Sequence, residues 1–207
     1  MSPSKQDRRR DLLKQRKTGS GATRSAESGA LRDVLRRWIS ENRMTTVCAY
    51  VPVGSEPGST DLLDDLRDTG CRVLLPVVVG QQPLDWSEYE GPGSLQAAGY
   101  GLREPIGTRA GPGAIGEADV VLVPALAVDR RGVRLGRGGG HYDRSLPLAG
   151  RDTVLAAVVR DEEFVESLPG EAHDVLVGAV ATPGGGVAEL PRPDPASADS
   201  RGDAPVT

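Results

Sequence analysis

Residues 133–144 of the chain read Val133-Arg134-Leu135-Gly136-Arg137-Gly138-Gly139-Gly140-His141-Tyr142-Asp143-Arg144. They follow residues 118–124, a β-branched run that is typical of a buried strand. Consecutive glycines let backbone N–H groups approach a ligand without obstruction by side chains, and successive exposed N–H groups form an anion-binding concavity. The competing interpretation of the same composition is a glycine-rich surface turn.

The rest of the chain alternates two kinds of pattern. Apolar runs predict buried strands at 47–51, 71–79, 119–124, 153–159 and 175–181. Leucines at helical spacing predict a helix through residues 31–39, capped by Ser28, and another through 62–66, ended near Gly70. Residues 80–118 lack a clear period, and we expect short strands there that form one wall of a cleft. The alternation predicts a three-layer, Rossmann-like α/β fold with a mostly parallel sheet and helices on both faces.

Ligands of such sheets bind beyond the carboxyl ends of the strands. Glu56 and the glycine-rich stretch both follow predicted strands. We therefore expect a carboxylate and an anion site on the same side of the sheet.

Composition limits the class of protein. The 207 residues suffice for one domain, which we place at 1–183, and the Gly-, Pro-, Ala- and Asp-rich residues 184–207 predict a disordered tail. The net charge of −4 gives no general attraction to nucleic acid. Cys48 and Cys71 lack the spacing of zinc ligands and are interpreted as buried free thiols of a reducing compartment. No run approaches the ~20 apolar residues that span a bilayer, so we expect a cytoplasmic protein.

Positive charge is concentrated at the N-terminus, where residues 1–24 hold eight basic and two acidic side chains. A solvated terminus is the usual interpretation of such a run. On a helix, however, Lys5 and Arg9 would lie side by side at i and i+4, which favours an anion bound between them.

The glycine stretch fits neither the P-loop, because no Lys follows the glycines, nor the dinucleotide fingerprint, because His141 stands where the third Gly belongs. The stretch does closely resemble the signature of the 5-formyltetrahydrofolate cyclo-ligase family, in which it is preceded by residues 123–129 and Gly132 and runs over 134–144. The resemblance extends to four further segments, namely residues 5–16, 49–56, 99–105 and 173–183.

The resemblance implies ATP-driven closure of 5-formyltetrahydrofolate to 5,10-methenyltetrahydrofolate, with release of ADP and phosphate. It implies folate contacts from Val51, Glu56, Tyr100 and Tyr142, and a catalytic role for Arg137 in stabilising charge on the transferred phosphoryl group. It implies ATP contacts from Lys5, Arg9, Arg134, Gly136, Arg137, Gly138, Gly139, Gly140, His141 and Tyr142. Asp143 is the first candidate for a Mg²⁺ ligand, and Asp174 is the second, with a turn cap as its alternative role.

The chain departs from the family pattern at three positions. Gly139 stands where many members have Lys, His141 where they have Tyr, and Gly178 where an aspartate is common. A folate-binding member that has lost its use of ATP is therefore one alternative, and a nucleic-acid-binding module built on the basic N-terminus is another. We expect a monomer whose partner is a reduced folate, with no affinity for nucleic acid or membrane.

Overall fold

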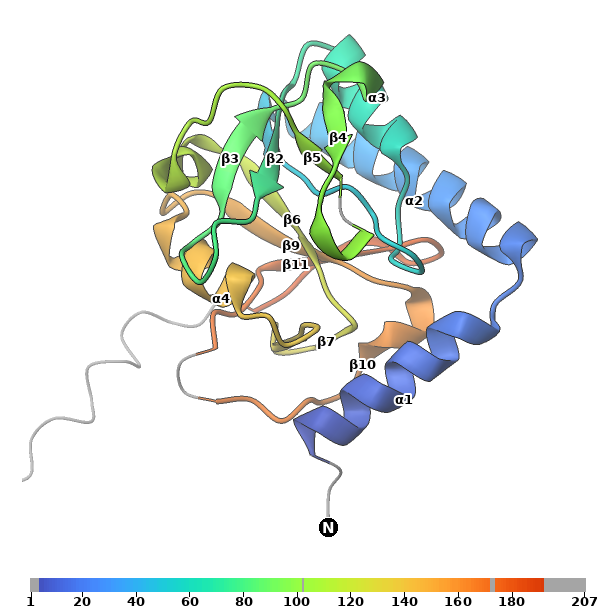
Figure 1. Cartoon of the computed structure of the whole chain (residues 1–207). Helices are drawn as coiled ribbons and strands as arrows, with labels where there is room; N and C mark the ends of the chain where they lie inside the picture. Colours follow the sequence, from blue (N-terminus) through green and yellow to red (C-terminus); the bar gives the residue numbers. More distant parts are fainter. Residues whose placement is uncertain (1–3, 102, 172–173, 192–207) are drawn as a thin grey trace, which may run out of the picture.

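The computed structural model describes residues 4–101, 103–171 and 174–191, and organises them around a seven-stranded sheet (Figure 1). The strand order is β12-β11-β9-β6-β1-β2-β3. Five central strands run parallel, namely β11 (Ala179–Thr182), β9 (Val154–Val158), β6 (Val120–Pro124), β1 (Thr46–Cys48) and β2 (Arg72–Val77). The edge strands β12 (Gly186–Glu189) and β3 (Asp85–Glu88) are antiparallel to their neighbours.

The central strands are mostly apolar, as expected of strands covered on both faces of the sheet. In β6, Val120, Val121, Leu122 and Val123 are all buried, and β9 pairs with β6 over five residue pairs from Val120↔Val154 to Pro124↔Val158. The mostly parallel sheet with buried central strands confirms the predicted α/β fold class.

One face of the sheet is covered by two helices, α2 (Gly21–Glu41) and α3 (Thr60–Asp68), which lie side by side in Figure 1. Leucines of both helices pack on the sheet in one core cluster with strand residues such as Val47 and Leu122. The predicted start of α2 is wrong. Ser20 caps the helix by accepting from Thr23 N, whereas the hydroxyl of Ser28 donates to Gly58 O at 3.0 Å.

The opposite face carries shorter elements. They are α4 (His141–Ser145) and the 3₁₀ turns η3 (Pro112–Glu117) and η4 (Leu146–Leu148), which supply Ile115 and Leu146 to a second core cluster. Trp86 of β3 is fully buried in the same cluster. Residues 80–118 also contain η1 (Pro92–Ser94), η2 (Gly99–Gly101) and a hairpin of β4 (Leu95–Ala97) with β5 (Arg103–Pro105), in agreement with the prediction of short strands.

A small second sheet, in the order β10-β7-β8, supports the glycine-rich stretch. Its strands are β7 (Ala127–Asp129), β8 (Arg134–Leu135) and β10 (Phe164–Val165), which follows the turn η5 (Asp161–Glu163). Gly132 lies in the β7–β8 turn at φ +85°, and a Cβ there would lie 2.3 Å from Val177 O. Only glycine fits this position, and the turn delivers β8 directly into the glycine stretch.

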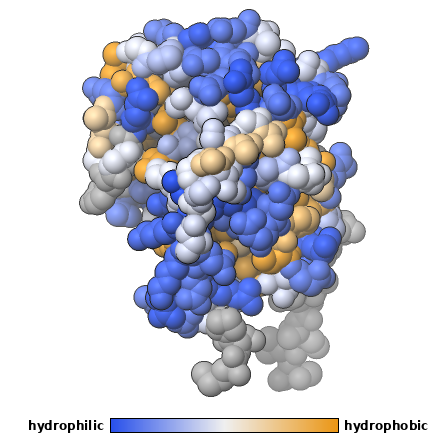
Figure 2. All heavy atoms as spheres, turned by 90° about the vertical axis from the view of Figure 1, so that its right-hand side faces the viewer, coloured by the Kyte–Doolittle hydropathy of each residue, from blue (hydrophilic) through white to orange (hydrophobic). Residues whose placement is uncertain are grey.

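The N-terminal residues form the predicted basic helix, α1 (Lys5–Thr18). Its axis is separate from that of α2, and the two are joined through Gly19 and Ser20 (Figure 1). Figure 2 views the side on which these helices lie and shows hydrophilic side chains over most of it. Among the described residues, no helix is long and apolar enough to span a bilayer.

The sheet extends beyond the domain boundary predicted at residue 183. Residues 186–189 form β12 and pair with β11 over four residue pairs, from Ala179↔Glu189 to Thr182↔Gly186. The prediction of a disordered tail is therefore wrong for this strand, because backbone pairing on an open sheet edge requires no apolar run. The remainder of the predicted tail, from residue 192, lies outside the described residues.

Candidate functional site

A cavity of about 730 Å³ opens beyond the carboxyl ends of the central strands. Segments that follow β1, β2 and β6 line it, together with the glycine stretch and α1. Glu56 and the glycines thus share one side of the sheet, as predicted. The predicted site residues that line the cavity are Lys5, Arg9, Val51, Glu56, Arg134, Gly136, Arg137, Gly138, Gly139, Gly140, His141, Tyr142, Asp143 and Asp174.

The glycine stretch forms a loop, residues 136–140, between β8 and α4. Gly138 adopts φ +100° and Gly140 φ +68°, conformations that favour glycine. Arg9 reaches this loop from α1 and donates from Nε to Gly136 O at 3.0 Å. The basic helix and the glycine loop therefore meet at the cavity, although they are more than 120 residues apart in the sequence.

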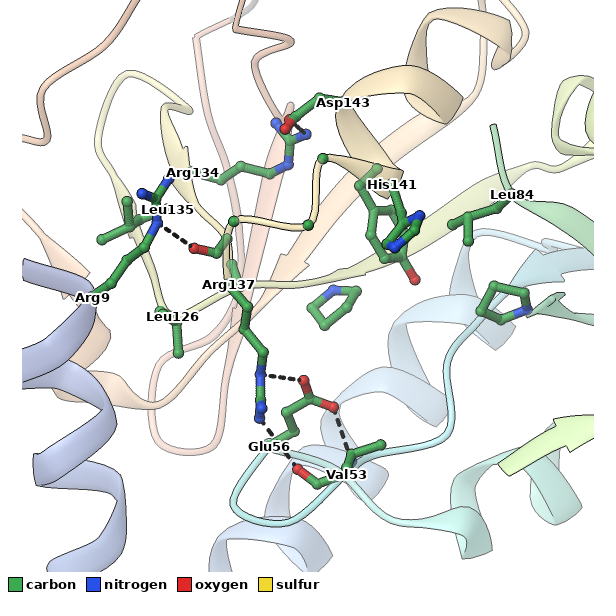
Figure 3. Close-up of a pocket in the computed structure, with 18 of the residues that line it drawn as sticks. Arg9, Val53, Glu56, Leu84, Leu126, Arg134, Leu135, Arg137, His141 and Asp143 are labelled. Carbon is green, nitrogen blue, oxygen red and sulfur yellow. Dashed lines mark hydrogen bonds and ion pairs between the residues drawn. The ribbon is translucent and has the colours of Figure 1, made fainter. Parts of the chain in front are cut away.

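Arg137 and Glu56 contact each other across the cavity (Figure 3). Arg137 Nε lies 3.0 Å from Glu56 Oε1, and the other carboxylate oxygen accepts from Val53 N at 2.9 Å. The Glu56 side chain is 13% exposed and that of Arg137 is 46% exposed. Glu56 is thus fixed by its own loop, and Arg137 reaches the same loop a second time, with Nη2 3.4 Å from Val53 O.

The two predicted metal ligands lie in separate ion pairs. Asp143 accepts from Arg134, whose Nη1 also donates to Val175 O at 2.9 Å. Asp174 Oδ2 lies 3.2 Å from Lys5 Nζ and accepts from the backbone N–H of Glu171 at 2.8 Å. Figure 3 shows Arg134 and Asp143 on the opposite side of the glycine loop from Arg137. In the described part of the chain, no three His, Cys, Asp or Glu side chains cluster as a metal site.

Tyr142 has a buried hydroxyl for which no hydrogen-bond partner exists among the described residues. Burial raises the pKa of the Tyr142 phenol well above its ordinary value, and the nearby Tyr50 and Glu56 act in the same direction. The hydroxyl therefore stays protonated and can donate a hydrogen bond to a ligand in the cavity.

Gly139 and His141, the two loop residues that differ from the family pattern, are in contact with the same side chain. His141 accepts at Nδ1 from Arg144 Nη2 at 3.2 Å, and Arg144 also donates to Gly139 O. A Cβ at position 139 would lie 3.1 Å from His141 Cδ2, closer than ordinary van der Waals contact. Glycine at 139 thus leaves room for the imidazole of His141.

Some cavity residues were not among the predicted site residues. Arg103 and Glu104 of β5 line the wall expected from residues 80–118, and Glu104 Oε1 accepts from Val78 N at 2.9 Å. They belong to the segment 99–105 quoted for the family resemblance, which was the available signal. Arg16 also lines the cavity and ends the segment 5–16 quoted for the family resemblance, but no charge pattern indicated that it is buried. The side chain of Tyr100, predicted to contact folate, lies outside the described residues.

Comparison with known proteins gives a consistent result. The profile of the 5-formyltetrahydrofolate cyclo-ligase family matches residues 1–183. A 5-formyltetrahydrofolate cyclo-ligase of Mycolicibacterium smegmatis is 50% identical over 198 residues, which cover 92% of this chain and 100% of that protein. The protein of the same name from Escherichia coli K12 is 31% identical over 141 residues, covering 67% of this chain and 78% of that one. The solution structure of a 5,10-methenyltetrahydrofolate synthetase from Aquifex aeolicus superposes with a TM-score of 0.77 at 26% identity, covering 92% and 94% of the two chains.

Proposed function

The chain belongs to the 5-formyltetrahydrofolate cyclo-ligase family, and from that premise we propose that it closes 5-formyltetrahydrofolate to 5,10-methenyltetrahydrofolate at the expense of ATP. The formyl oxygen is a poor leaving group. Transfer of the γ-phosphoryl group to it makes a phosphate ester that N10 displaces when it attacks the formyl carbon. The products are the methenyl cation, ADP and phosphate. Positioning and charge neutralisation provide most of the catalysis in such a transfer.

The observation that carries this proposal is the contact between Arg137 and Glu56 inside the cavity. A carboxylate such as Glu56 can accept two N–H bonds from the aminopyrimidine of a pterin. Arg137 belongs to the glycine loop, where exposed N–H groups favour phosphate. The formyl group of the folate and the γ-phosphoryl group of ATP would then lie next to each other at the contact between Glu56 and Arg137.

Two basic side chains of α1 reach the cavity beside the glycine loop. Lys5 and Arg9 face it from α1, and Arg9 already contacts the loop at Gly136 O. We assign both cations and residues 136–140 to the ATP phosphates. Arg137 is assigned to the transferred group because its fork can bond two phosphoryl oxygens at once.

We assign Mg²⁺ to the same site, held by ATP phosphates and one carboxylate of the chain. Mg²⁺ typically uses few carboxylates and keeps several water ligands, so the lack of a three-residue cluster among the described residues fits this mode. Asp143 fits best because its side chain is 60% exposed and lines the cavity. Asp174 remains the second candidate. The ion would neutralise phosphate charge when bound.

The test is the near-ultraviolet absorbance of the methenyl product, followed with the purified protein, 5-formyltetrahydrofolate, Mg²⁺ and ATP. We expect the chromophore to grow only when ATP is present. Arg137→Ala should slow its growth by about 10²–10³-fold, as for loss of one preorganised charge-stabilising group. Arg130→Ala is the matched control, since Arg130 pairs with Glu166 on the surface and does not line the cavity.

The same assay, together with a measurement of folate binding, distinguishes the cyclo-ligase from the alternative of a folate-binding member without ATP use. Tight binding of 5-formyltetrahydrofolate without ATP-dependent product would favour a member that has lost ATP use, and would direct attention to Gly139. Absence of both binding and product would contradict the proposal altogether.

A further inference from the structure

Helix α1 is attached to the rest of the molecule mainly by polar contacts. Only Leu12 of its side chains packs on a core cluster, and the chain turns away from the helix direction at Gly19, which has φ −65° and ψ 141°. A Cβ at Gly19 would have no neighbour within 4 Å, and the connection is held by a hydrogen bond from the Arg24 guanidinium of α2 to Gly19 O. Most of the other contacts that hold the direction of α1 are polar contacts of the helix itself.

The strongest of these contacts involves Arg16, which is 1% exposed. Its Nε and Nη2 bond the two carboxylate oxygens of Glu163 at 2.6 and 2.7 Å, and Nη2 also donates to Ala125 O at 2.6 Å. Glu163 is 2% exposed and also accepts from the backbone N–H of Arg160 at 2.9 Å. A bidentate pair of this kind fixes orientation as well as distance.

Arg16 shares a helix face with the two cations assigned to ATP. Lys5, Arg9 and Arg16 are spaced by four and seven residues, which places them on one side of a 3.6-residue helix. All three line the same cavity. Anchoring Arg16 therefore fixes the rotation of α1 about its axis, and with it the direction of Lys5 and Arg9.

We propose that the buried Arg16–Glu163 pair is a positioning element for ATP binding: it holds α1 so that Lys5 and Arg9 line the cavity and Arg9 contacts the glycine loop. The proposal rests on the assignment of ATP to this cavity. In this proposal Arg16 does not contact a substrate itself. Its effect passes through Lys5 and Arg9, so its loss should weaken ATP use selectively and leave the folate side, at Glu56, largely intact.

The test uses the double variant Arg16→Met with Glu163→Gln in the full chain. Removing both charges avoids an unpaired buried ion, and Gln keeps an acceptor for Arg160 N. We expect the KM for ATP to rise about tenfold, because misplacing a binding group by about 1 Å is enough for such a loss. The KM for 5-formyltetrahydrofolate should stay within about twofold. Arg130→Met with Glu166→Gln, an exposed pair elsewhere, is the matched control and should move neither value.

Arg16→Lys keeps the charge but loses the bidentate fork, and it carries the test if the double variant does not fold. It should raise the KM for ATP by a smaller factor than the double variant. A folded variant with an unchanged KM for ATP would overturn the proposal. Parallel losses in both KM values and in kcat would also overturn it, because they would indicate a general structural role.

Calorimetric titration with ATP makes this inference separable from the proposed function. If the wild-type protein binds ATP but forms no methenyl product, the proposed function fails. The positioning role is then decided by whether the double variant binds ATP about tenfold more weakly than the wild-type protein. If the wild-type protein binds no ATP, both proposals fail.

Discussion

Arg137 Nε lies 3.0 Å from Glu56 Oε1, so a side chain assigned to phosphate and one assigned to folate are direct neighbours. The contact joins residues that are 81 positions apart, brought together by the loop after β1 and the loop after β8. Charge on either residue is felt by the other at this distance. Substitution of one is therefore expected to change how the protein handles both substrates, but to different extents.

Glu56→Gln should weaken folate binding more than ATP binding. The neutral amide still accepts from Val53 N but replaces one charged acceptor with a donor. Loss of a hydrogen bond to a charged group costs about 1.5–3 kcal/mol, so the KM for 5-formyltetrahydrofolate should rise ~10- to 100-fold. Initial rates over a folate series measure this, with exposed Glu162→Gln as the control. An unchanged folate KM would remove Glu56 from the binding site.

Gly138→Ala should destabilise the conformation of the glycine loop without creating a steric clash. Gly138 has φ +100°, and the nearest atoms to an added Cβ, in the Arg9 guanidinium, lie at 3.9 Å. Forcing alanine into this conformation costs about 1–3 kcal/mol or shifts the loop. We expect a raised KM for ATP and a lower midpoint in urea. Gly113→Ala, at an open position without positive φ, should change neither. Equal behaviour of the two variants would show that the loop conformation is not needed.

The architecture was predictable because it rests on long local patterns. The run 118–124 is typical of a buried strand and contains β6, and parallel strands place the loops after them on one side of the sheet. The position of the cavity next to Glu56 and the glycine loop followed from that order alone. The family resemblance added the candidate roles of individual residues.

The start of α2 was missed because the signal lies in a cap and not in an apolar stripe. Residues 21–27 have no fully buried side chain, so the spacing of apolar residues does not indicate that they are helical. The sequence signal for the helix start is Ser20, whose hydroxyl caps it. Strand β12 was missed for a related reason, since it is held by backbone pairing to β11. Buried Arg16 was missed because its partner, Glu163, is 147 residues away.

Asp129→Asn should flatten the acid dependence of stability. Burial raises the pKa of the Asp129 carboxyl, but hydrogen bonds from Leu168 N, from the Arg131 guanidinium and from the backbone of Arg131 and Val133 outweigh it, so the pKa is lowered. The stabilisation is therefore present above the unfolded pKa of about 4 and is lost as pH falls through the folded pKa.

Urea unfolding of the Asp129→Asn variant at pH 7 and at pH 3 tests this. At pH 7 the variant should lose about 2–3 kcal/mol, since charged hydrogen bonds are removed from a buried site. The difference from the wild-type protein should shrink at pH 3. A constant difference at both pH values would mean that the carboxylate charge is not what stabilises the β7–β8 turn.

The two thiols should react at very different rates. Burial raises the pKa of Cys48 to about 12, whereas Cys71 is half-buried and its Sγ donates to Met44 O at 3.5 Å. At pH 8 only about 10⁻⁴ of Cys48 would be thiolate, the reactive form. Titration with an aromatic disulfide reagent should therefore label Cys71 in the native protein and Cys48 only after unfolding. Single Cys→Ala variants assign the two phases, and rapid native labelling of Cys48 would contradict the burial.

Tyr142→Phe should separate binding from stability. The Tyr142 hydroxyl is buried without a partner among the described residues, so its removal sacrifices no hydrogen bond of the free protein. Since an unsatisfied buried polar group costs about 1–3 kcal/mol, the variant should unfold at the same or a higher urea concentration. Tyr89→Phe is the matched control, because the Tyr89 hydroxyl bonds Asp64 Oδ1 at 3.0 Å, and its loss should cost about 1 kcal/mol.

Substrate affinity supplies the second half of the Tyr142 test. The hydroxyl lies at the cavity that holds Glu56 and Arg137, and burial keeps it protonated as a donor. If a ligand accepts from it, Tyr142→Phe raises the KM for that substrate by about tenfold while the protein stays as stable as before. Whichever KM rises, for folate or for ATP, identifies the substrate that lies against the ring. A variant with unchanged KM values and increased stability would assign Tyr142 to packing alone, and would leave Glu56 and Arg137 as the polar groups between the two substrates.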